Sequence, residues 1–206
     1  MYLSKLTLNI SSYRVQKELS NPYQLHRTIM RAFPDNLNKL KDDGRILFRI
    51  ERYTKNPNPS VLVQSSICPD WSFLLEDKDY LIKSPLFKQF NYPNFSKGNK
   101  YWFRLYTNPT KKSDKKRVGM YKENEQYEWL KRKAEKGGFN IIHVNIIRKE
   151  KITASTNKKS RKMTFDGAQF EGVLEILNPE KFKLELSNGI GSGKAFGFGL
   201  LSIAKL

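Results

Sequence analysis

The chain has 206 residues, 38% of them hydrophobic and 13% aromatic, which is enough for packed cores and argues against a disordered chain. Its 38 lysines and arginines against 20 acids give a net charge of +18, so we expect a polyanionic partner. One cysteine and two histidines exclude a disulfide framework, a cysteine-based metal site and a histidine-rich metal cluster. Carboxylates can still bind magnesium, but no compact acidic motif stands out, so we expect metal-independent function with no cofactor. Apolar runs of about 18 residues are absent, so we expect a cytoplasmic protein without a membrane partner.

The first hundred residues predict a strand, a helical region and further strands. Residues 2–10 alternate between apolar and polar side chains, as a half-buried strand does. A helical region follows to about Phe33, and residues 46–51 and 61–64 predict two more strands. The stretch 101–107 has a β-rich composition, and we assign it as the fourth strand of the first unit. Its aromatic side chains fill a core or, if exposed, form a base-stacking platform.

A helix start at Asn21 carries the main candidate for chemistry. Asparagine is a good N-cap, and the following Pro22 suits the first helical position. Two faces then separate at about 100° per residue. An apolar stripe holds Leu25, Ile29 and Ala32, and another face is shared by Tyr23, His26, Arg27 and Met30. His26 thus points away from the inward-packing stripe, although a lone histidine near a helix start is more often an ordinary surface residue.

The second half predicts a similar succession of elements. A basic stretch, 109–118, is the best linker candidate, and residues 123–136 predict a helix. Strands at 139–147 and 170–177 flank a hairpin whose tip, 157–162, carries four cations. We therefore expect an α+β fold with tandem ferredoxin-like (RRM-like) βαββαβ domains. The expected boundaries are an N-terminal domain at 1–108 with the His26 helix, a linker at 109–118, and a C-terminal domain at 119–206.

Residues 189–199 hold five of the 12 glycines in the chain. Glycine permits positive φ and a close backbone approach, so exposed N–H groups in such a loop can cradle a phosphate while Lys194 adds charge. The simpler interpretation is a tight turn into a last strand. The spacing fits neither a Walker loop nor a dinucleotide-binding motif, since a strand and not a helix follows.

Several of these segments together resemble one protein family. They are the opening strand, Tyr23-x-x-His26-Arg27, residues 44–49, Pro69-Asp70-Trp71, Phe170-Glu171-Gly172, and Gly189-Ile190-Gly191 through Gly199-Leu200-Leu201-Ser202. Over nearly the whole chain the sequence resembles the CasE-type CRISPR precursor-RNA endoribonucleases.

The resemblance implies two ferredoxin-like domains and a glycine-rich loop near the C-terminus. It implies metal-free cleavage of CRISPR repeat RNA at the base of its stem-loop, retention of the crRNA product, and assembly with other Cascade subunits. The family's catalytic tyrosine and histidine fall on Tyr23 and His26. The expected RNA-binding residues are Arg27, Lys158, Lys159, Arg161, Lys162, Gly189, Gly191, Gly193, Lys194, Gly197 and Gly199.

RNA supplies its own nucleophile, the 2′-OH, so the protein has to align it, move protons and stabilise the charged transition state. Attack on the scissile phosphate leaves a 2′,3′-cyclic phosphate and a 5′-OH. His26 can exchange protons near neutrality, as base or as acid, because histidine has an ordinary pKa of about 6.5. Tyr23, at about 10, is better suited to orienting the 2′-OH or the phosphate.

Two other protein classes fit parts of the sequence. One is a non-catalytic RNA-binding or assembly subunit of a ribonucleoprotein, which composition alone favours. The other is a basic ribosomal-type protein, which fits the charge but gives no reason for the face that carries Tyr23, His26 and Arg27. Cleavage of repeat RNA in excess chelator distinguishes the enzyme from both.

Overall fold

The computed structural model describes residues 1–35, 45–52, 57–114, 116–156 and 162–206. The chain forms two compact units. Unit 1 comprises residues 1–91, 153–163 and 195–197, and unit 2 comprises residues 92–152, 164–194 and 198–206. Across the described ranges, every helix is too short or too polar to span a membrane.

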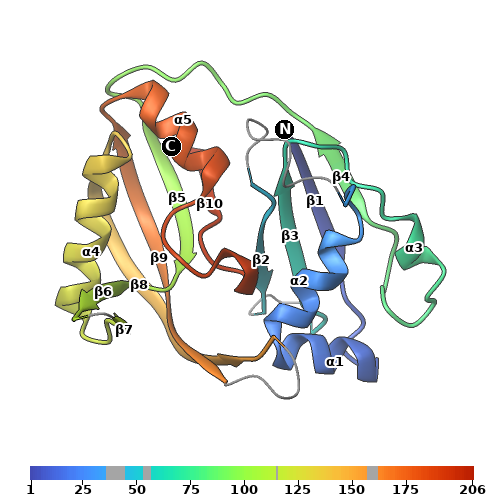
Figure 1. The fold of residues 1–206 in the computed structure, drawn as a ribbon. Helices are drawn as coiled ribbons and strands as arrows, with labels where there is room; N and C mark the ends of the chain where they lie inside the picture. Colours follow the sequence, from blue (N-terminus) through green and yellow to red (C-terminus); the bar gives the residue numbers. More distant parts are fainter. Residues whose placement is uncertain (36–44, 53–56, 115, 157–161) are drawn as a thin grey trace. The chain divides into compact units, whose positions relative to one another are not determined.

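Unit 1 is a four-stranded antiparallel sheet with helices (Figure 1). Its strands lie in the order β2-β3-β1-β4, the order of a ferredoxin-like domain. Adjacent strands are antiparallel, and Leu6 of β1 pairs with Val61 of β3. The elements are β1 (Tyr2–Thr7), α1 (Tyr13–Ser20), α2 (Pro22–Met30), β2 (Leu47–Glu51), β3 (Ser60–Ser65), α3 (Ser72–Leu75) and β4 (Leu86–Gln89).

The core of unit 1 fixes the orientation of α2. Leu25, Ile29 and Ala32 are buried, as the predicted apolar stripe requires, and they pack in one cluster with Leu6 and Val61. Full burial of a leucine or isoleucine contributes roughly 1.5–3 kcal/mol. Since this stripe faces the sheet, the opposite face of α2 is left for other contacts.

Unit 2 repeats the same topology. Its sheet has the order β10-β5-β9-β8, and a separate two-stranded hairpin pairs β6 with β7. The elements are β5 (Lys100–Thr107), β6 (Thr110–Ser113), β7 (Lys116–Gly119), α4 (Glu123–Lys136), β8 (Phe139–Ala154), β9 (Met163–Ile176), α5 (Pro179–Asn188), the 3₁₀ turn η2 (Lys194–Phe196) and β10 (Leu201–Lys205). The predicted tandem ferredoxin-like fold is confirmed.

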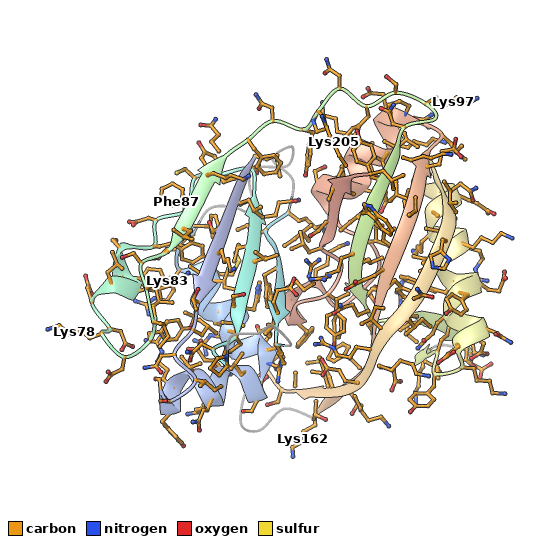
Figure 2. All side chains as sticks on the ribbon, turned by 180° about the vertical axis from the view of Figure 1, so that it is seen from behind. Lys78, Lys83, Phe87, Lys97, Lys162 and Lys205 are labelled. Carbon is orange, nitrogen blue, oxygen red and sulfur yellow. The ribbon has the colours of Figure 1, made fainter. Side chains whose placement is uncertain are left out.

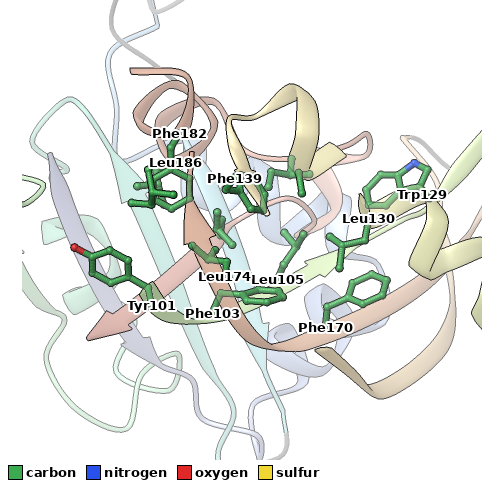
Figure 3. Packing of buried hydrophobic residues seen from close by; sticks show 14 of the residues in the cluster. Tyr101, Phe103, Leu105, Trp129, Leu130, Phe139, Phe170, Leu174, Phe182 and Leu186 are labelled. Carbon is green, nitrogen blue, oxygen red and sulfur yellow. The ribbon is translucent and has the colours of Figure 1, made fainter. Parts of the chain in front are cut away.

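The second core is aromatic (Figure 3). Phe182 of α5 packs edge-on against Phe139 of β8, with 5.5 Å between ring centroids. Tyr101 and Phe103 of β5 belong to the same cluster, whereas Trp102 between them is 51% exposed. The aromatic side chains at alternate positions of β5 therefore fill a core, as the first of the two interpretations has it.

The structure divides the chain differently from the predicted boundaries. The stretch 101–107 is the first strand of unit 2, and β4 closes the sheet of unit 1. All four β4 residues are exposed, including Phe87 (Figure 2), so the strand lacks the alternation that identifies a half-buried strand. The expected linker 109–118 overlaps the β6–β7 hairpin of unit 2, which extends to Gly119. Both strands of this hairpin carry cations, so the sequence lacks the apolar alternation that would predict their pairing.

Candidate functional site

The start of α2 is tied to the end of β8 within unit 1. Pro22 occupies the first turn as predicted, but the Asn21 side chain does not cap the helix. Its Nδ2 donates to the Ser155 carbonyl at 3.0 Å, and the Ser155 N–H donates to its Oδ1 at 3.3 Å. Ser155 directly follows β8, at the base of the basic hairpin. Asn21 thus joins the two segments that the sequence singled out separately.

Tyr23 and His26 lie together on the polar face of α2. Their ring centroids are 5.9 Å apart, with an angle of 46° between the planes. Phe48 of β2 stacks against His26 at 6.2 Å, and the rings are inclined by 11°. Phe196 of η2 lies 5.8 Å from Tyr23. Two aromatic side chains from distant parts of the sequence therefore restrict the two predicted catalytic rings.

Partial burial changes the pKa of His26. The side chain is half-buried, and desolvation lowers its pKa from the ordinary value of 6.5. Burial disfavours the imidazolium because water no longer solvates the charge fully. The neutral imidazole, which can accept a proton, is therefore the main form of His26 near neutral pH.

Two of the predicted RNA-binding cations are described on the surface of unit 1. Arg27 is exposed on α2, and among the described residues it makes no ion pair. Lys162 is exposed just before β9 (Figure 2). The predicted contacts Lys158, Lys159 and Arg161 lie outside the described residues.

The glycine-rich loop contributes residues to both units, 195–197 to unit 1 and the rest to unit 2. Its five glycines all have positive φ, from +73° at Gly189 to +93° at Gly199. Gly197 lies against Phe48, and a Cβ there would sit 3.1 Å from the ring. Gly189, Gly197 and Gly199 are buried, whereas Gly191, Gly193 and Lys194 are half-buried. The turn interpretation therefore accounts for the buried glycines, and the half-buried residues have surface to offer a phosphate.

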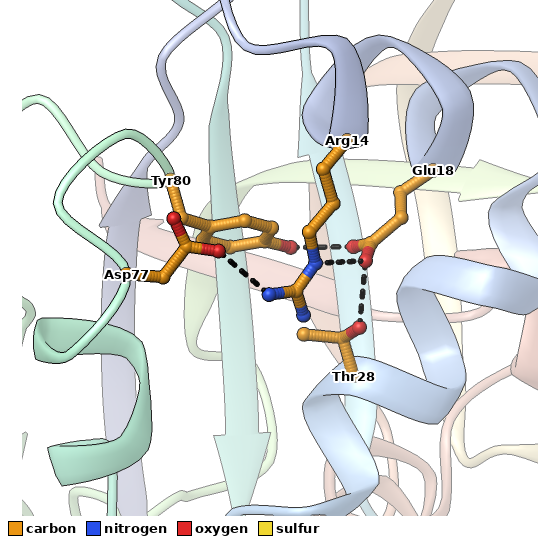
Figure 4. Close-up of polar contacts among 5 residues, drawn as sticks. All are labelled: Arg14, Glu18, Thr28, Asp77 and Tyr80. Carbon is orange, nitrogen blue, oxygen red and sulfur yellow. Dashed lines mark hydrogen bonds and ion pairs between the residues drawn. The ribbon is translucent and has the colours of Figure 1, made fainter.

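A buried polar cluster links α2 to α1 and to the chain after α3 (Figure 4). The Glu18 carboxylate of α1 accepts hydrogen bonds from Thr28 of α2 at 2.8 Å and from the Tyr80 hydroxyl at 2.5 Å. Arg14 donates to the same carboxylate at 3.1 Å and to Asp77 at 2.7 Å. Burial first, and then the Glu18 charge, raises the pKa of Tyr80. Thr28 lies two residues beyond His26, so the cluster fixes the helix that carries it.

Sequence reasoning did not identify Phe48, Phe196 or Glu18 as parts of the site. Phe48 lies in a predicted strand, where an aromatic residue indicates only a core. The available signal at Phe196 is an aromatic residue directly before a glycine of the glycine-rich loop. A buried glutamate has no sequence signature of its own, because its partners lie up to 62 residues away in the chain.

Residues 1–205 match the model of a family described as CRISPR associated protein. One relative is the CRISPR-associated endoribonuclease Cse3 of Thermus thermophilus, 35% identical over 216 residues that cover 99% of this chain and 100% of the relative. Another is the CRISPR system Cascade subunit CasE of Escherichia coli, 31% identical over 219 residues that cover both chains completely.

A solved structure resembles this fold closely. It is that of the CRISPR endoribonuclease Cse3 bound to 19 nt RNA, with a TM-score of 0.88 and 34% identity. The alignment covers 99% of this chain and 100% of the other. The similarity therefore extends over both units and not over one domain alone.

Proposed function

We propose a function from the premise that this chain belongs to the CRISPR-associated protein family. It is a metal-independent endoribonuclease of the CasE type that processes CRISPR RNA. Its substrate is the CRISPR repeat RNA, which it cleaves at the base of the stem-loop. It keeps the crRNA product and assembles with other Cascade subunits. The RNA-bound Cse3 structure and the Cascade name of the E. coli relative support these assignments.

The pairing of Tyr23 with His26 carries the proposal. The 2′-OH upstream of the scissile phosphate loses its proton to a base and attacks phosphorus, and the bond from phosphorus to the 5′ oxygen of the next nucleotide breaks as that oxygen takes up a proton from an acid or from water. The products are a 2′,3′-cyclic phosphate and a 5′-OH. His26 accepts the proton of the 2′-OH, because its lowered pKa keeps the imidazole neutral. Tyr23, 5.9 Å away between ring centroids, orients the reacting group through its hydroxyl.

Positive charge stabilises the phosphorane and holds the RNA. Arg27 is exposed one residue beyond His26 and can reach a phosphate oxygen. Lys158, Lys159, Arg161 and Lys162 contact the stem from the basic hairpin, which Asn21 ties to the start of α2. On the glycine loop, Gly191, Gly193 and Lys194 face the RNA, whereas Gly189, Gly197 and Gly199 shape the backbone.

The decisive experiment uses His26→Ala with labelled repeat hairpin RNA in excess chelator. Loss of proton transfer should slow single-turnover cleavage by roughly 10²–10⁴-fold and leave the Kd for RNA nearly unchanged. The matched control is His143→Ala, since His143 is the other histidine and is exposed. A 2′-deoxy substitution at the cleavage position should abolish the reaction. If the wild type binds the hairpin but leaves it uncut, the protein is an RNA-binding subunit and the enzyme proposal is wrong.

A further inference from the structure

A strongly basic pocket lies in unit 2, and all of its described lining residues belong to that unit. Its volume is about 470 Å³. Hairpin β6–β7, the last two turns of α4 and the start of the glycine-rich loop line it. No acidic residue is among its described lining residues. The six cations that line it are Lys111, Lys112, Arg117, Arg132, Lys133 and Lys136.

The fold places several of these like charges next to one another. Lys112 and Arg117 are directly opposite partners in the β6–β7 register. Arg132 and Lys136 are four residues apart on α4, one helical turn from each other. Like charges at both kinds of position destabilise the element that holds them. A bound polyanion would offset this repulsion, and burial of apolar surface does not explain it, because all four side chains are exposed.

Most of the cations also lack an acidic partner. Lys111 pairs with Glu125 at 2.7 Å, and Lys133 lies over the Trp129 ring at 5.7 Å. For Lys112, Arg117, Arg132 and Lys136, no ion pair forms among the residues that the structure describes. The negative end of the α4 dipole accounts for cations in its last turn, such as Lys136. It gives no reason for Lys112 and Arg117, which come from a different element.

We propose that this pocket binds the sugar-phosphate backbone of RNA, with two or more phosphates held by the lysines and arginines. The site rests on the proposed function only in that RNA is taken as the ligand. Trp129 is 5% exposed, so its ring is not available for base stacking, and the exposed recognition groups are cationic. Such a site reads charge and backbone geometry, and it adds affinity that is independent of base sequence.

The test compares two variants that each remove three cations from unit 2. The pocket variant is Lys112→Ala/Arg117→Ala/Arg132→Ala, and the control is Lys181→Ala/Lys183→Ala/Lys205→Ala, whose side chains are all exposed outside the pocket. The Kd for repeat RNA is measured between about 50 and 200 mM salt. The slope of log K against log salt should flatten by about 2–3 units in the pocket variant, since each lost phosphate contact removes about 0.7–0.9. The control should keep the wild-type slope.

Two further measurements separate the possible outcomes. Single-turnover cleavage at saturating protein should be unchanged in the pocket variant, because Tyr23 and His26 are intact. If the wild type does not cleave, the proposed function fails while the salt slopes still test the pocket. Thermal unfolding should show the pocket variant to be at least as stable as the wild type. Equal slopes for the two variants would overturn the proposal, as would full affinity for repeat RNA in the pocket variant.

Discussion

Thr28 of α2 donates its hydroxyl hydrogen to the Glu18 carboxylate of α1, with 2.8 Å between Oγ1 and Oε1. Both side chains are buried at 7% exposure. The same carboxylate accepts from Tyr80 and Arg14, so one acidic group connects α1, α2 and the chain after α3 (Figure 4). The bond holds the segment of α2 that begins two residues beyond His26, and it links stability to the site.

Removing the acceptor of this cluster should destabilise unit 1 strongly. Glu18→Leu leaves the buried hydroxyls of Thr28 and Tyr80 without their carboxylate, and each unsatisfied group costs about 1–3 kcal/mol. Thr28→Val removes one donor at nearly constant shape and should cost about 1 kcal/mol in the free energy of unfolding. Urea unfolding measures both. Lys17→Ala, at an exposed position of α1, serves as control and should change stability by less than about 0.5 kcal/mol.

The lowered pKa of His26 makes stability depend on pH in a defined direction. Burial disfavours the protonated ring in the folded protein, so below the ordinary pKa of 6.5 the unfolded chain binds more protons. The free energy of unfolding should therefore fall as the pH drops through the interval between 6.5 and the lowered pKa, and be unaffected by His26 above 6.5. Urea unfolding near pH 8 and near pH 5 should show a smaller loss on acidification in His26→Gln than in the wild type. An equal loss in both proteins would contradict this expectation.

The same pKa predicts the pH profile of cleavage. If neutral His26 is the base, the single-turnover rate should rise with pH to a plateau, with its midpoint below 6.5. The rate has to be measured at subsaturating RNA, which reports the pKa of the free protein, because phosphates near the imidazole shift its pKa upward in the complex. A rate that falls with rising pH through that midpoint would make His26 the general acid.

The local pattern of unit 1 could be predicted from sequence because its signals are short-range. The apolar stripe of Leu25, Ile29 and Ala32 and the alternation in β1 depend only on helix and strand periods. The fourth strand could not be predicted in this way. β4 is a short edge strand with all four residues exposed, so pairing with β1 and not side-chain burial defines it.

The candidate site could be predicted only in part for a similar reason. Tyr23 and His26 share a helix face by sequence spacing, which predicts their proximity. Their neighbours Phe48 and Phe196 come from 22 or more residues away, and no period in the sequence relates them. Asn21 is a residue type that favours the N-cap position. Its side chain instead forms hydrogen bonds with Ser155, 134 residues away, because tertiary contacts compete for the same side chain.

Phe196 should matter for cleavage through Tyr23. Aromatic pairs at this spacing contribute about 0.5–1.5 kcal/mol beyond their buried area, so Phe196→Ala should loosen the Tyr23 ring. We expect the single-turnover rate to fall about 3- to 10-fold, since about 1.4 kcal/mol corresponds to a factor of ten. Phe196→Tyr, which keeps a ring, should restore most of the rate. If Phe196→Ala weakens RNA affinity at an unchanged rate, Phe196 contacts RNA and does not position Tyr23.

Gly197 and Gly98 offer a matched pair that separates backbone strain from crowding at the site. Their φ values are +86° and +87°, so alanine at either position meets the same left-handed strain, about 1–2 kcal/mol. At Gly98 the nearest atom to an added Cβ is a Glu175 oxygen at 4.0 Å, whereas at Gly197 it is the Phe48 ring at 3.1 Å. Phe48 in turn stacks on His26 at 6.2 Å. Gly197→Ala should lose more unfolding free energy than Gly98→Ala, because crowding adds to the shared strain, and only Gly197→Ala should also slow single-turnover cleavage, because the displaced Phe48 ring shifts His26. Equal cleavage rates in the two variants would show that the Phe48 contact does not position the imidazole.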